Sequence, residues 1–212
     1  MGHGSRSPSE NLSSGELSFK VGDQSRRRFL VNASAVIGAG VAVGVGAPFV
    51  MSLAPSERAR AAGAPIEVDI SQIEPGMKIS AEWRGKVVWV LHRSKEMVAN
   101  LAKTDALVED PKSEQEQQPA YAKNEHRSIK PEYLVLEGVC THLGCSPTQR
   151  NEIAPADLGN DWFGGFFCPC HGSKFDLSGR VYKGVPAPLN LRVPPHHYVG
   201  DSKIVIGEDQ SA

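Results

Sequence analysis

The sequence lacks an excess of charge of either sign. Its 23 Lys and Arg residues are balanced by 24 Asp and Glu residues, which gives a net charge of -1 over 212 residues. Apart from a short N-terminal run, the basic residues are scattered, so the sequence shows no basic patch of the kind that binds nucleic acid. No internal repeat with a period of about 20 to 50 residues is visible. We therefore expect no nucleic-acid partner, and one ordinary domain with an accessory segment.

The N-terminal region divides into a polar segment and an apolar one. Residues 1–24 are rich in Ser, Gly and polar residues without apolar periodicity, and predict a disordered cytoplasmic tail. The next charge-free stretch, Phe29 to Leu53, would span about 38 Å as a helix, which exceeds a hydrocarbon core of about 30 Å. Residues 25–53 therefore predict a transmembrane anchor. A cleaved secretory signal is the alternative, because small-residue sites occur at 59–64.

The residues that flank the apolar stretch predict its orientation. Arg26 and Arg27 lie in the segment "SRRRFL", which resembles the twin-arginine export signal of proteins that cross the membrane already folded. The basic residues before the stretch favour a cytoplasmic N-terminus, with the rest of the chain on the far side. Residues 54–65 carry small and charged side chains without an apolar face. They predict a flexible hinge, either coil or marginal helix.

From Ile66 onward the pattern changes to period-two alternation, which predicts a mainly β, antiparallel domain over residues 66–212. A turn at Gly85 is predicted to join two strands into a hairpin, with Trp89 in the core. Ser94 is expected to cap a short helix, and residues 109–118 to form a polar surface insertion. The predicted strands are 66–70, 77–83, 86–92, 132–139, 180–184, 191–199 and 203–208.

Cysteine is scarce, and all four cysteines fall in two short clusters. The first is "CTHLGC", with Cys140, His142 and Cys145. The second is "CPCHGS", with Cys168, Cys170, His171 and Ser173. Each cluster follows a strand-like segment, supplies one Cys and one His, and keeps one additional cysteine. The pattern indicates four ligands and two spare thiols.

Two kinds of metal site and one thiol chemistry compete for these residues. Cys140, His142, Cys168 and His171 could hold a tetrahedral zinc ion, but the Cys-x-His spacing is tighter than usual and zinc leaves two cysteines without a role. A thiol oxidoreductase requires Cys-x-x-Cys at the start of a helix, which "CPC" does not provide. A Rieske 2Fe-2S centre uses two cysteines on one iron and two histidines on the other. The donor set favours this centre.

On these two motifs the chain resembles the Rieske iron-sulfur subunit of ubiquinol:cytochrome c reductase, the cytochrome bc complex, of the bacterial type. The resemblance extends over the export signal, the anchor and the whole β domain. It implies an antiparallel β-sandwich head with a cluster-binding subdomain at about residues 138–191. One Rieske-type 2Fe-2S cluster is implied, with Cys140 and Cys168 on the inner iron and His142 and His171 on the outer one.

The resemblance also implies a disulfide between Cys145 and Cys170, which suits an exported and therefore oxidising location. His171 would present its free nitrogen to the quinol, and Ser173 would donate a hydrogen bond to a bridging sulfide. Phe175 stands where well-known members carry a tyrosine, whose hydroxyl it cannot replace. We therefore predict a lower reduction potential than in a tyrosine-bearing relative.

Two further features follow from the same resemblance. The segment 183–191, with Gly184, Pro186 and Pro188, resembles the family's proline loop that covers the cluster, and the prolines would stiffen it. Leu143, apolar at an exposed loop tip, would help the head to dock against cytochrome b.

The implied function is electron transfer in quinol:cytochrome c reductase, which makes the chain an oxidoreductase subunit. The cluster would take an electron from ubiquinol, with a proton on a histidine ligand, and pass the electron to the c-type cytochrome, which contributes to proton translocation. The expected setting is a dimeric complex with cytochrome b and the c-type cytochrome in a bacterial inner membrane, with a periplasmic head. Two alternatives stay open: a Rieske subunit of a periplasmic molybdenum enzyme such as arsenite oxidase, and a zinc-stabilised interaction module. The proline loop and the long separation between His142 and Cys168 favour the quinol reductase.

Overall fold

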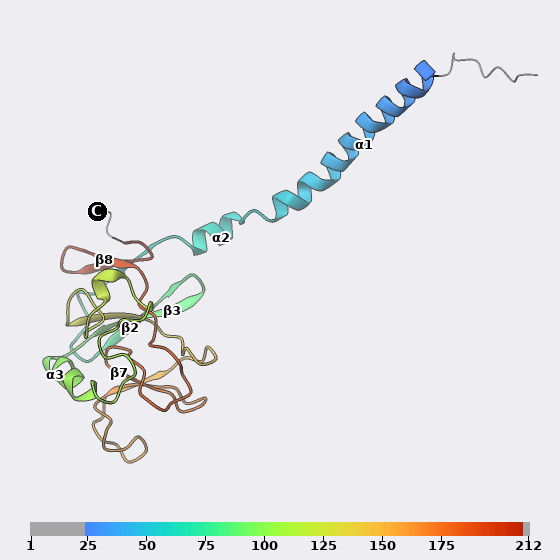
Figure 1. Cartoon of the computed structure of the whole chain (residues 1–212). Coiled ribbons are helices and arrows are strands. Elements are labelled where there is room, and N and C mark those ends of the chain that lie inside the picture. The colour runs from blue at the N-terminus through green and yellow to red at the C-terminus, as the bar shows by residue number, and fades with distance from the viewer. Residues whose placement is uncertain (1–23, 210–212) are drawn as a thin grey trace, which may run out of the picture. The chain divides into compact units, whose positions relative to one another are not determined.

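The computed structural model describes residues 24–209, which divide into two compact units, one up to Pro55 and one from Ser56 onward (Figure 1). We describe the units separately, as an N-terminal helix and a head. The predicted disordered tail lies outside the described residues except for Gln24, which is the first residue of α1.

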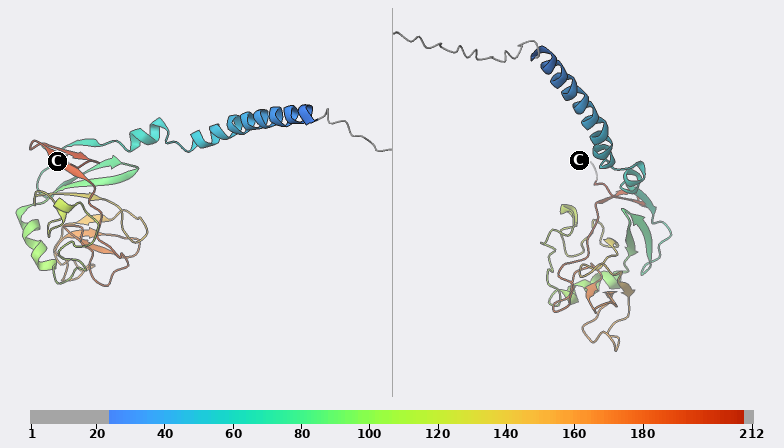
Figure 2. Two further views of the ribbon diagram at one scale, coloured as in Figure 1. Left: turned by 45° about the horizontal axis from the view of Figure 1, so that its top comes forward. Right: turned by 90° about the vertical axis from the view of Figure 1, so that its right-hand side faces the viewer.

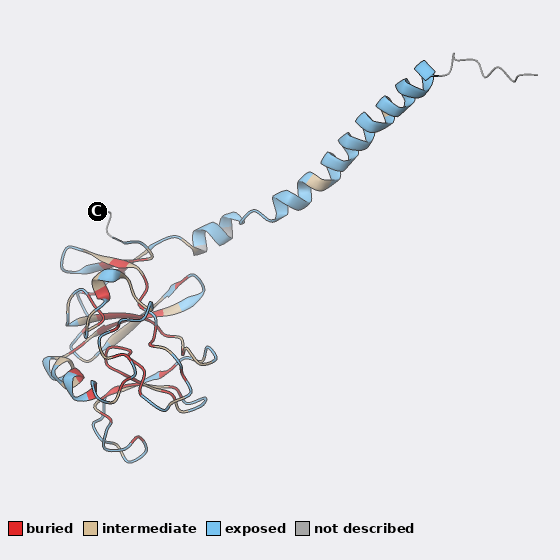
Figure 3. Ribbon diagram, in the orientation of Figure 1, coloured by how far each residue is buried: buried red, intermediate tan, exposed pale blue. Residues whose placement is uncertain are grey.

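The first unit contains one long helix, α1 (Gln24–Ser52), of 29 residues. At about 1.5 Å per residue it spans about 44 Å, and among the described helices it is the one long and apolar enough to cross a membrane. Its side chains are exposed along almost the whole length, including Phe29, Val36 and Phe49 (Figure 3). An apolar surface with no protein partner suits a helix that lies in lipid. Arg26 and Arg27 lie in its first turn.

The second unit begins at a short helix, α2 (Glu57–Ala62). The Ser56 hydroxyl caps it by accepting a hydrogen bond from the Ala59 amide over 3.2 Å. The segment 54–65 is therefore helical over six residues, and the boundary between the two units falls at its start.

The described part of the head contains three antiparallel sheets of three strands each. Both views of Figure 2 show β8 and β9 at one end of the head. In strand order, the sheets are β1 (Ile66–Asp69), β9 (Lys203–Ile206) and β8 (His196–Val199); then β2 (Lys78–Trp83), β3 (Lys86–His92) and β4 (Tyr133–Glu137); then β5 (Thr148–Arg150), β6 (Gly165–Phe167) and β7 (Lys174–Asp176). The mainly β, antiparallel class is confirmed.

Strand β3 separates the two larger cores. It pairs with β2 through a two-residue turn, Arg84 and Gly85, both at positive φ (53° and 70°), as a type I′ hairpin requires. Because side chains alternate along a strand, Trp89 packs into the core that contains the Cys140 and Cys168 side chains. Val88 and Val90, on the opposite face, belong to the core that includes residues of β1 and β9. The hairpin and the buried position of Trp89 are confirmed.

The helical elements of the head support this arrangement. Ser94 caps α3 (Lys95–Thr104) by accepting a hydrogen bond from the Met97 amide over 3.2 Å, as predicted. A short 3-10 helix, η2, covers Ala120–Ala122. The expected surface insertion at 109–118 is only partly correct, because Asp110 and Ser113 are buried. The Asp110 carboxylate accepts hydrogen bonds from the amides of residues 114 and 115, within the segment, and the Glu109 amide donates to the Val181 carbonyl over 3.0 Å, which fixes the segment against the head.

One predicted strand was wrong, and two strands, β5 and β7, were missed, whereas β6 is the strand-like segment expected before the second cysteine cluster. Residues 180–184 form only isolated bridges, Val108 with Tyr182 and Phe175 with Val181, because the chain turns through a hydrogen-bonded loop after β7. Strands β5, β6 and β7 have three residues each, too few to show alternation in the sequence. They form the small sheet that carries the second cysteine cluster.

Candidate metal centre

The first cysteine loop is closed by its own backbone. The Cys140 amide donates to the Cys145 carbonyl over 2.7 Å, and the Gly144 amide donates to the Cys140 carbonyl over 3.0 Å. Gly144 has φ of 86°, a conformation that side chains with a Cβ rarely adopt. The loop leaves strand β4 and therefore starts from a buried, fixed point.

The second loop repeats this pattern. The Cys168 amide donates to the Ser173 carbonyl over 2.8 Å, and the Gly172 amide donates to the Cys168 carbonyl over 2.9 Å. Gly172 has φ of 77°. This loop joins β6 to β7. Both loops thus hold a buried cysteine at their first position through the same pair of backbone hydrogen bonds.

Two thiols are free and buried in the centre of the site. Cys140 is 3% exposed and Cys168 is 2% exposed. Burial raises the pKa of the Cys140 thiol above its usual value. Thiolates at these positions therefore need a neighbouring positive charge. A bound metal would supply that charge.

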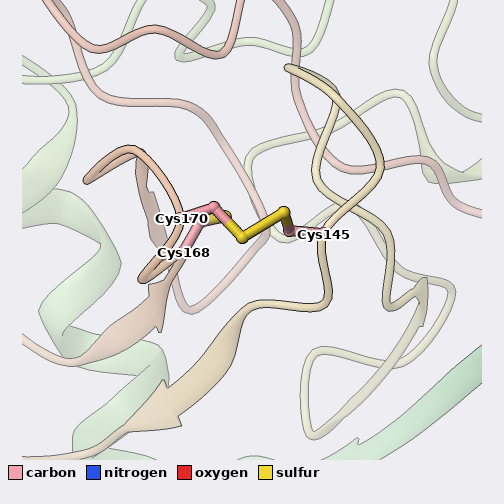
Figure 4. Close-up of side chains that lie close together, drawn as sticks. All are labelled: Cys145, Cys168 and Cys170. Carbon is pink, nitrogen blue, oxygen red and sulfur yellow. A yellow bond between two sulfur atoms is a disulfide. The ribbon is translucent and has the colours of Figure 1, made fainter.

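A disulfide between Cys145 and Cys170 joins the two loops, with Cα atoms 6.7 Å apart. Figure 4 shows it beside Cys168, and the three sulfurs lie within 4.8 Å of one another. Because two of these sulfurs are bonded to each other, Cys168 alone of this group offers a thiolate. The predicted pairing is present in the structure.

The two histidines come together as well. The rings of His142 and His171 lie with their centroids 4.7 Å apart and their planes at 88°. His171 is exposed and His142 is half-buried. Two buried thiols and two imidazoles nearer to the surface fit a 2Fe-2S centre, with thiolates on one iron and imidazoles on the other.

The proline loop is attached to both cysteine loops. The Ala187 amide donates to the Ser173 hydroxyl over 3.0 Å, and the Thr141 hydroxyl donates to the Leu189 carbonyl over 2.6 Å. Sequence reasoning missed Thr141, because its partner is 48 residues away. Pro186 and Pro188 are exposed on either side of Ala187, which is buried. Gly184, at φ of 70°, begins the loop.

Two other predicted residues differ in burial. Leu143 is 71% exposed at the tip of the first loop. Phe175 is fully buried in β7 and belongs to the same apolar core as Cys140 and Cys168.

Sequence reasoning also missed a group of three buried arginine side chains. Arg93, Arg127 and Arg180 are each at most 2% exposed, and all three contact the turn at residues 176–180. Charged residues are normally exposed, so no sequence signal distinguishes these arginines from surface ones.

Comparisons with known proteins show what the chain is similar to. The family model for the Rieske [2Fe-2S] domain matches residues 71–195. A "Ubiquinol-cytochrome c reductase iron-sulfur subunit" from Allochromatium vinosum is 60% identical over 190 residues, 88% of this chain and 90% of that protein. The protein of the same name from Bradyrhizobium diazoefficiens is 44% identical, over 86% of this chain and 94% of that protein. A solved "Hyperthermophilic respiratory Complex III" chain is 28% identical, over 80% of this chain and 98% of that chain, with a TM-score of 0.44.

Fold, site and matched domain define a Rieske protein that binds a 2Fe-2S cluster. More particularly, the chain belongs to the family of bacterial ubiquinol-cytochrome c reductase iron-sulfur subunits. Its class of function is electron transport, and α1 is its candidate membrane anchor.

Proposed function

We propose that this chain is the electron-transfer subunit of a quinol:cytochrome c reductase complex, in which it takes one electron and one proton from ubiquinol and passes the electron to a c-type cytochrome. The observation that carries the proposal is the pair His142 and His171, whose rings lie 4.7 Å apart in the two loops that also hold the buried thiols. An exposed imidazole at such a centre can meet a quinol hydroxyl directly.

The four donors have different tasks in this proposal. Cys140 and Cys168 would hold one iron in the buried core, and His142 and His171 would hold the other nearer to the surface. When bound, the 2Fe-2S cluster supplies a one-electron acceptor of high potential, because neutral imidazoles replace two thiolates. His171 is exposed, and once its imidazole has lost the proton on the ring nitrogen that is not bound to metal, that nitrogen could accept the proton that leaves the quinol hydroxyl.

Neighbouring residues orient the site and control access to it. The hydrogen bonds of Ser173 and Thr141 hold the proline loop 183–191 against both cysteine loops. The fixed φ angles of Pro186 and Pro188 stiffen this loop, which limits access of water. Leu143 offers an exposed apolar contact for docking on cytochrome b.

The location of the head follows from the anchor. In this proposal α1 crosses a bacterial inner membrane once, with the N-terminus in the cytoplasm and the head in the periplasm. The segment 54–65 serves as the hinge that lets the head reach cytochrome b and then the c-type cytochrome. Export of the folded head would depend on the pair Arg26 and Arg27, whose guanidinium groups lysine does not replace.

Replacing both arginines tests the export step. The double variant Arg26→Lys, Arg27→Lys keeps the charge of the N-terminal turn, and we expect its head to remain in the cytoplasm, protected from protease added to spheroplasts. Arg28→Lys is the matched control and should export normally. A double variant whose head is digested as fast as that of the unaltered protein contradicts the use of this signal.

Purification of the native complex tests the function. The expected preparation contains b-type and c-type haem, forms a dimeric complex, oxidises ubiquinol with reduction of cytochrome c, and shows the electron paramagnetic resonance signal of a histidine-ligated 2Fe-2S cluster after reduction. A molybdenum cofactor in place of haem would instead identify a Rieske subunit of a molybdenum oxidase. Bound zinc without the resonance signal would identify a non-redox module.

A further inference from the structure

Three buried guanidinium groups converge on the turn that follows β7. Arg93 donates to the Leu177 carbonyl over 3.1 Å, and Arg127 donates to the carbonyls of Ser178 and Gly179 over 3.0 and 3.2 Å. Arg180 lies in the turn itself. Strand β7 carries Lys174 to Asp176 and directly follows the second cysteine loop. The arginines therefore brace the part of the head that positions the cluster ligands.

The three arginines differ in how their charges are balanced. Arg180 donates to the carboxylates of Asp176 over 2.7 Å and of Asp105 over 2.8 Å. Within residues 24–209, neither Arg93 nor Arg127 forms an ion pair, and both donate to neutral oxygens. Burial lowers the pKa of Arg93 to about 10 and that of Arg127 to about 9, so both remain charged at neutral pH. Two buried positive charges are thus left without a direct counter-charge.

Residues of the apolar core that contains the free thiols also contact these charges. Arg93 and Arg127 contact the backbone of Leu177 and Leu191. The side chains of these leucines belong to the same buried core as Cys140 and Cys168. Such a core screens charge poorly compared with water, so the field of the guanidinium groups extends into the site.

The net charge of the cluster changes on reduction. Two ferric ions, two sulfides, two thiolates and two neutral imidazoles sum to a neutral group, and one electron added without a proton makes it an anion. Fixed positive charges in a weakly screening medium stabilise the anion and leave the neutral form nearly unaffected. We propose that Arg93 and Arg127 are positioning residues that raise the reduction potential of the cluster through their buried charges, in addition to bracing the turn at 176–180. The proposal assumes that the cluster lies between the two cysteine loops.

The test is a redox titration of the cluster signal by electron paramagnetic resonance, on the full-length protein in membranes. Arg93→Gln and Arg127→Gln each remove a buried positive charge, and we expect each to lower the midpoint potential. Asp176→Asn removes the buried negative charge beside Arg180, and we expect it to raise the midpoint. A loss of bracing would shift the midpoint potential of all three variants in the same direction. Shifts in opposite directions therefore identify an effect of charge.

Two further variants separate charge from bracing. Gln118→Ala removes a neutral acceptor that Arg127 uses at 3.0 and 3.2 Å, and it should lower the melting temperature while the midpoint stays unchanged. Ser128→Asp places a carboxylate where Arg93 now donates to a hydroxyl over 2.8 Å. This variant keeps the guanidinium group and its other hydrogen bonds, and should lower the midpoint even if the glutamine variants fail to fold.

The outcomes are decisive for the proposal. An unchanged midpoint in Ser128→Asp with a native resonance signal overturns it, as does a lowered midpoint in Asp176→Asn. The readout does not require quinol turnover. A protein that shows the expected shifts but oxidises no quinol would therefore contradict the proposed function and leave the tuning by the arginines intact.

Discussion

The amide nitrogen of Ala187 donates a hydrogen bond to the hydroxyl oxygen of Ser173 over 3.0 Å, and so connects the proline loop to the second cysteine loop. Because the oxygen accepts this bond, the hydroxyl proton is available for donation to sulfur. Burial is the largest influence on the pKa of the nearby Cys140 thiol and raises it, whereas the Ser173 hydroxyl lowers it. Ser173 is therefore placed both to hold the proline loop and to stabilise negative charge on sulfur.

Replacing this serine should affect stability and potential together. Ser173→Ala leaves the buried Ala187 amide without an acceptor, which costs about 1 to 3 kcal/mol of unfolding free energy. The lost donor also lowers the midpoint potential, since less stabilisation of the reduced cluster remains. Urea unfolding and redox titration measure the two effects. Ser146→Ala, at an exposed position next to the other loop, is the control, and equal behaviour of the two variants would contradict this role.

Removal of the disulfide should loosen both loops at once. Cys145 and Cys170 are 25 residues apart, so the crosslink lowers the entropy of the unfolded chain by an amount equivalent to about 3 to 4 kcal/mol. The double variant Cys145→Ala, Cys170→Ala should unfold at correspondingly lower urea concentration and lose its cluster more readily. Reductant should lower the urea concentration at which the unaltered protein unfolds towards that of the variant, and should leave the variant's value unchanged. A double variant as stable as the oxidised, unaltered protein would rule out a stabilising role for the disulfide.

Phe175→Tyr tests the tuning of the cluster at β7. Phe175 is fully buried and shares its core with Cys140 and Cys168, so a hydroxyl on this ring would be shielded from water and available to sulfur. We expect a raised midpoint, because one more donor stabilises the added electron. Phe163→Tyr, outside this core, should leave the midpoint unchanged. A Phe175→Tyr midpoint that is unchanged or lowered would show that the prediction is wrong.

His196 should make the head less stable in mild acid. It is 1% exposed, its Nδ1 lies 2.9 Å from the Pro194 carbonyl, and burial lowers its pKa below the usual value of about 6.5. Below about pH 6.5 the unfolded chain binds a proton here more readily than the folded one, so stability falls as the pH falls through this window.

Urea unfolding at about pH 7 and about pH 5 measures this loss of stability. In His196→Phe the titrating group is absent, and the loss between the two pH values should be smaller. His126, whose pKa is lowered by burial and then by Arg93, keeps part of the dependence in both proteins. An equal loss in the variant and in the unaltered protein would mean that His196 does not titrate as expected.

The chemistry of the site could be read largely from the sequence. The two clusters concentrate every cysteine of the chain within motifs of fixed spacing, and a motif of this kind needs only local backbone geometry to place its donors. The hairpin at Gly85 and the cap at Ser94 were predictable for the same reason, since turn and cap preferences act over a few residues. The strand expected at 180–184 was wrong because Arg180, Val181 and Tyr182 are buried in a loop that forms only isolated bridges.

The sequence by itself determined the long apolar helix, the β class of the head and the candidate metal donors, because periodicity and motif spacing are local properties. The tertiary structure alone decided that Thr141 holds the proline loop, and that Arg93 is buried against the turn after β7. Arg93 and Leu177 are 84 residues apart in the chain. A charged side chain becomes buried only when distant segments supply its hydrogen-bond partners, and such partners leave no periodic pattern in the sequence.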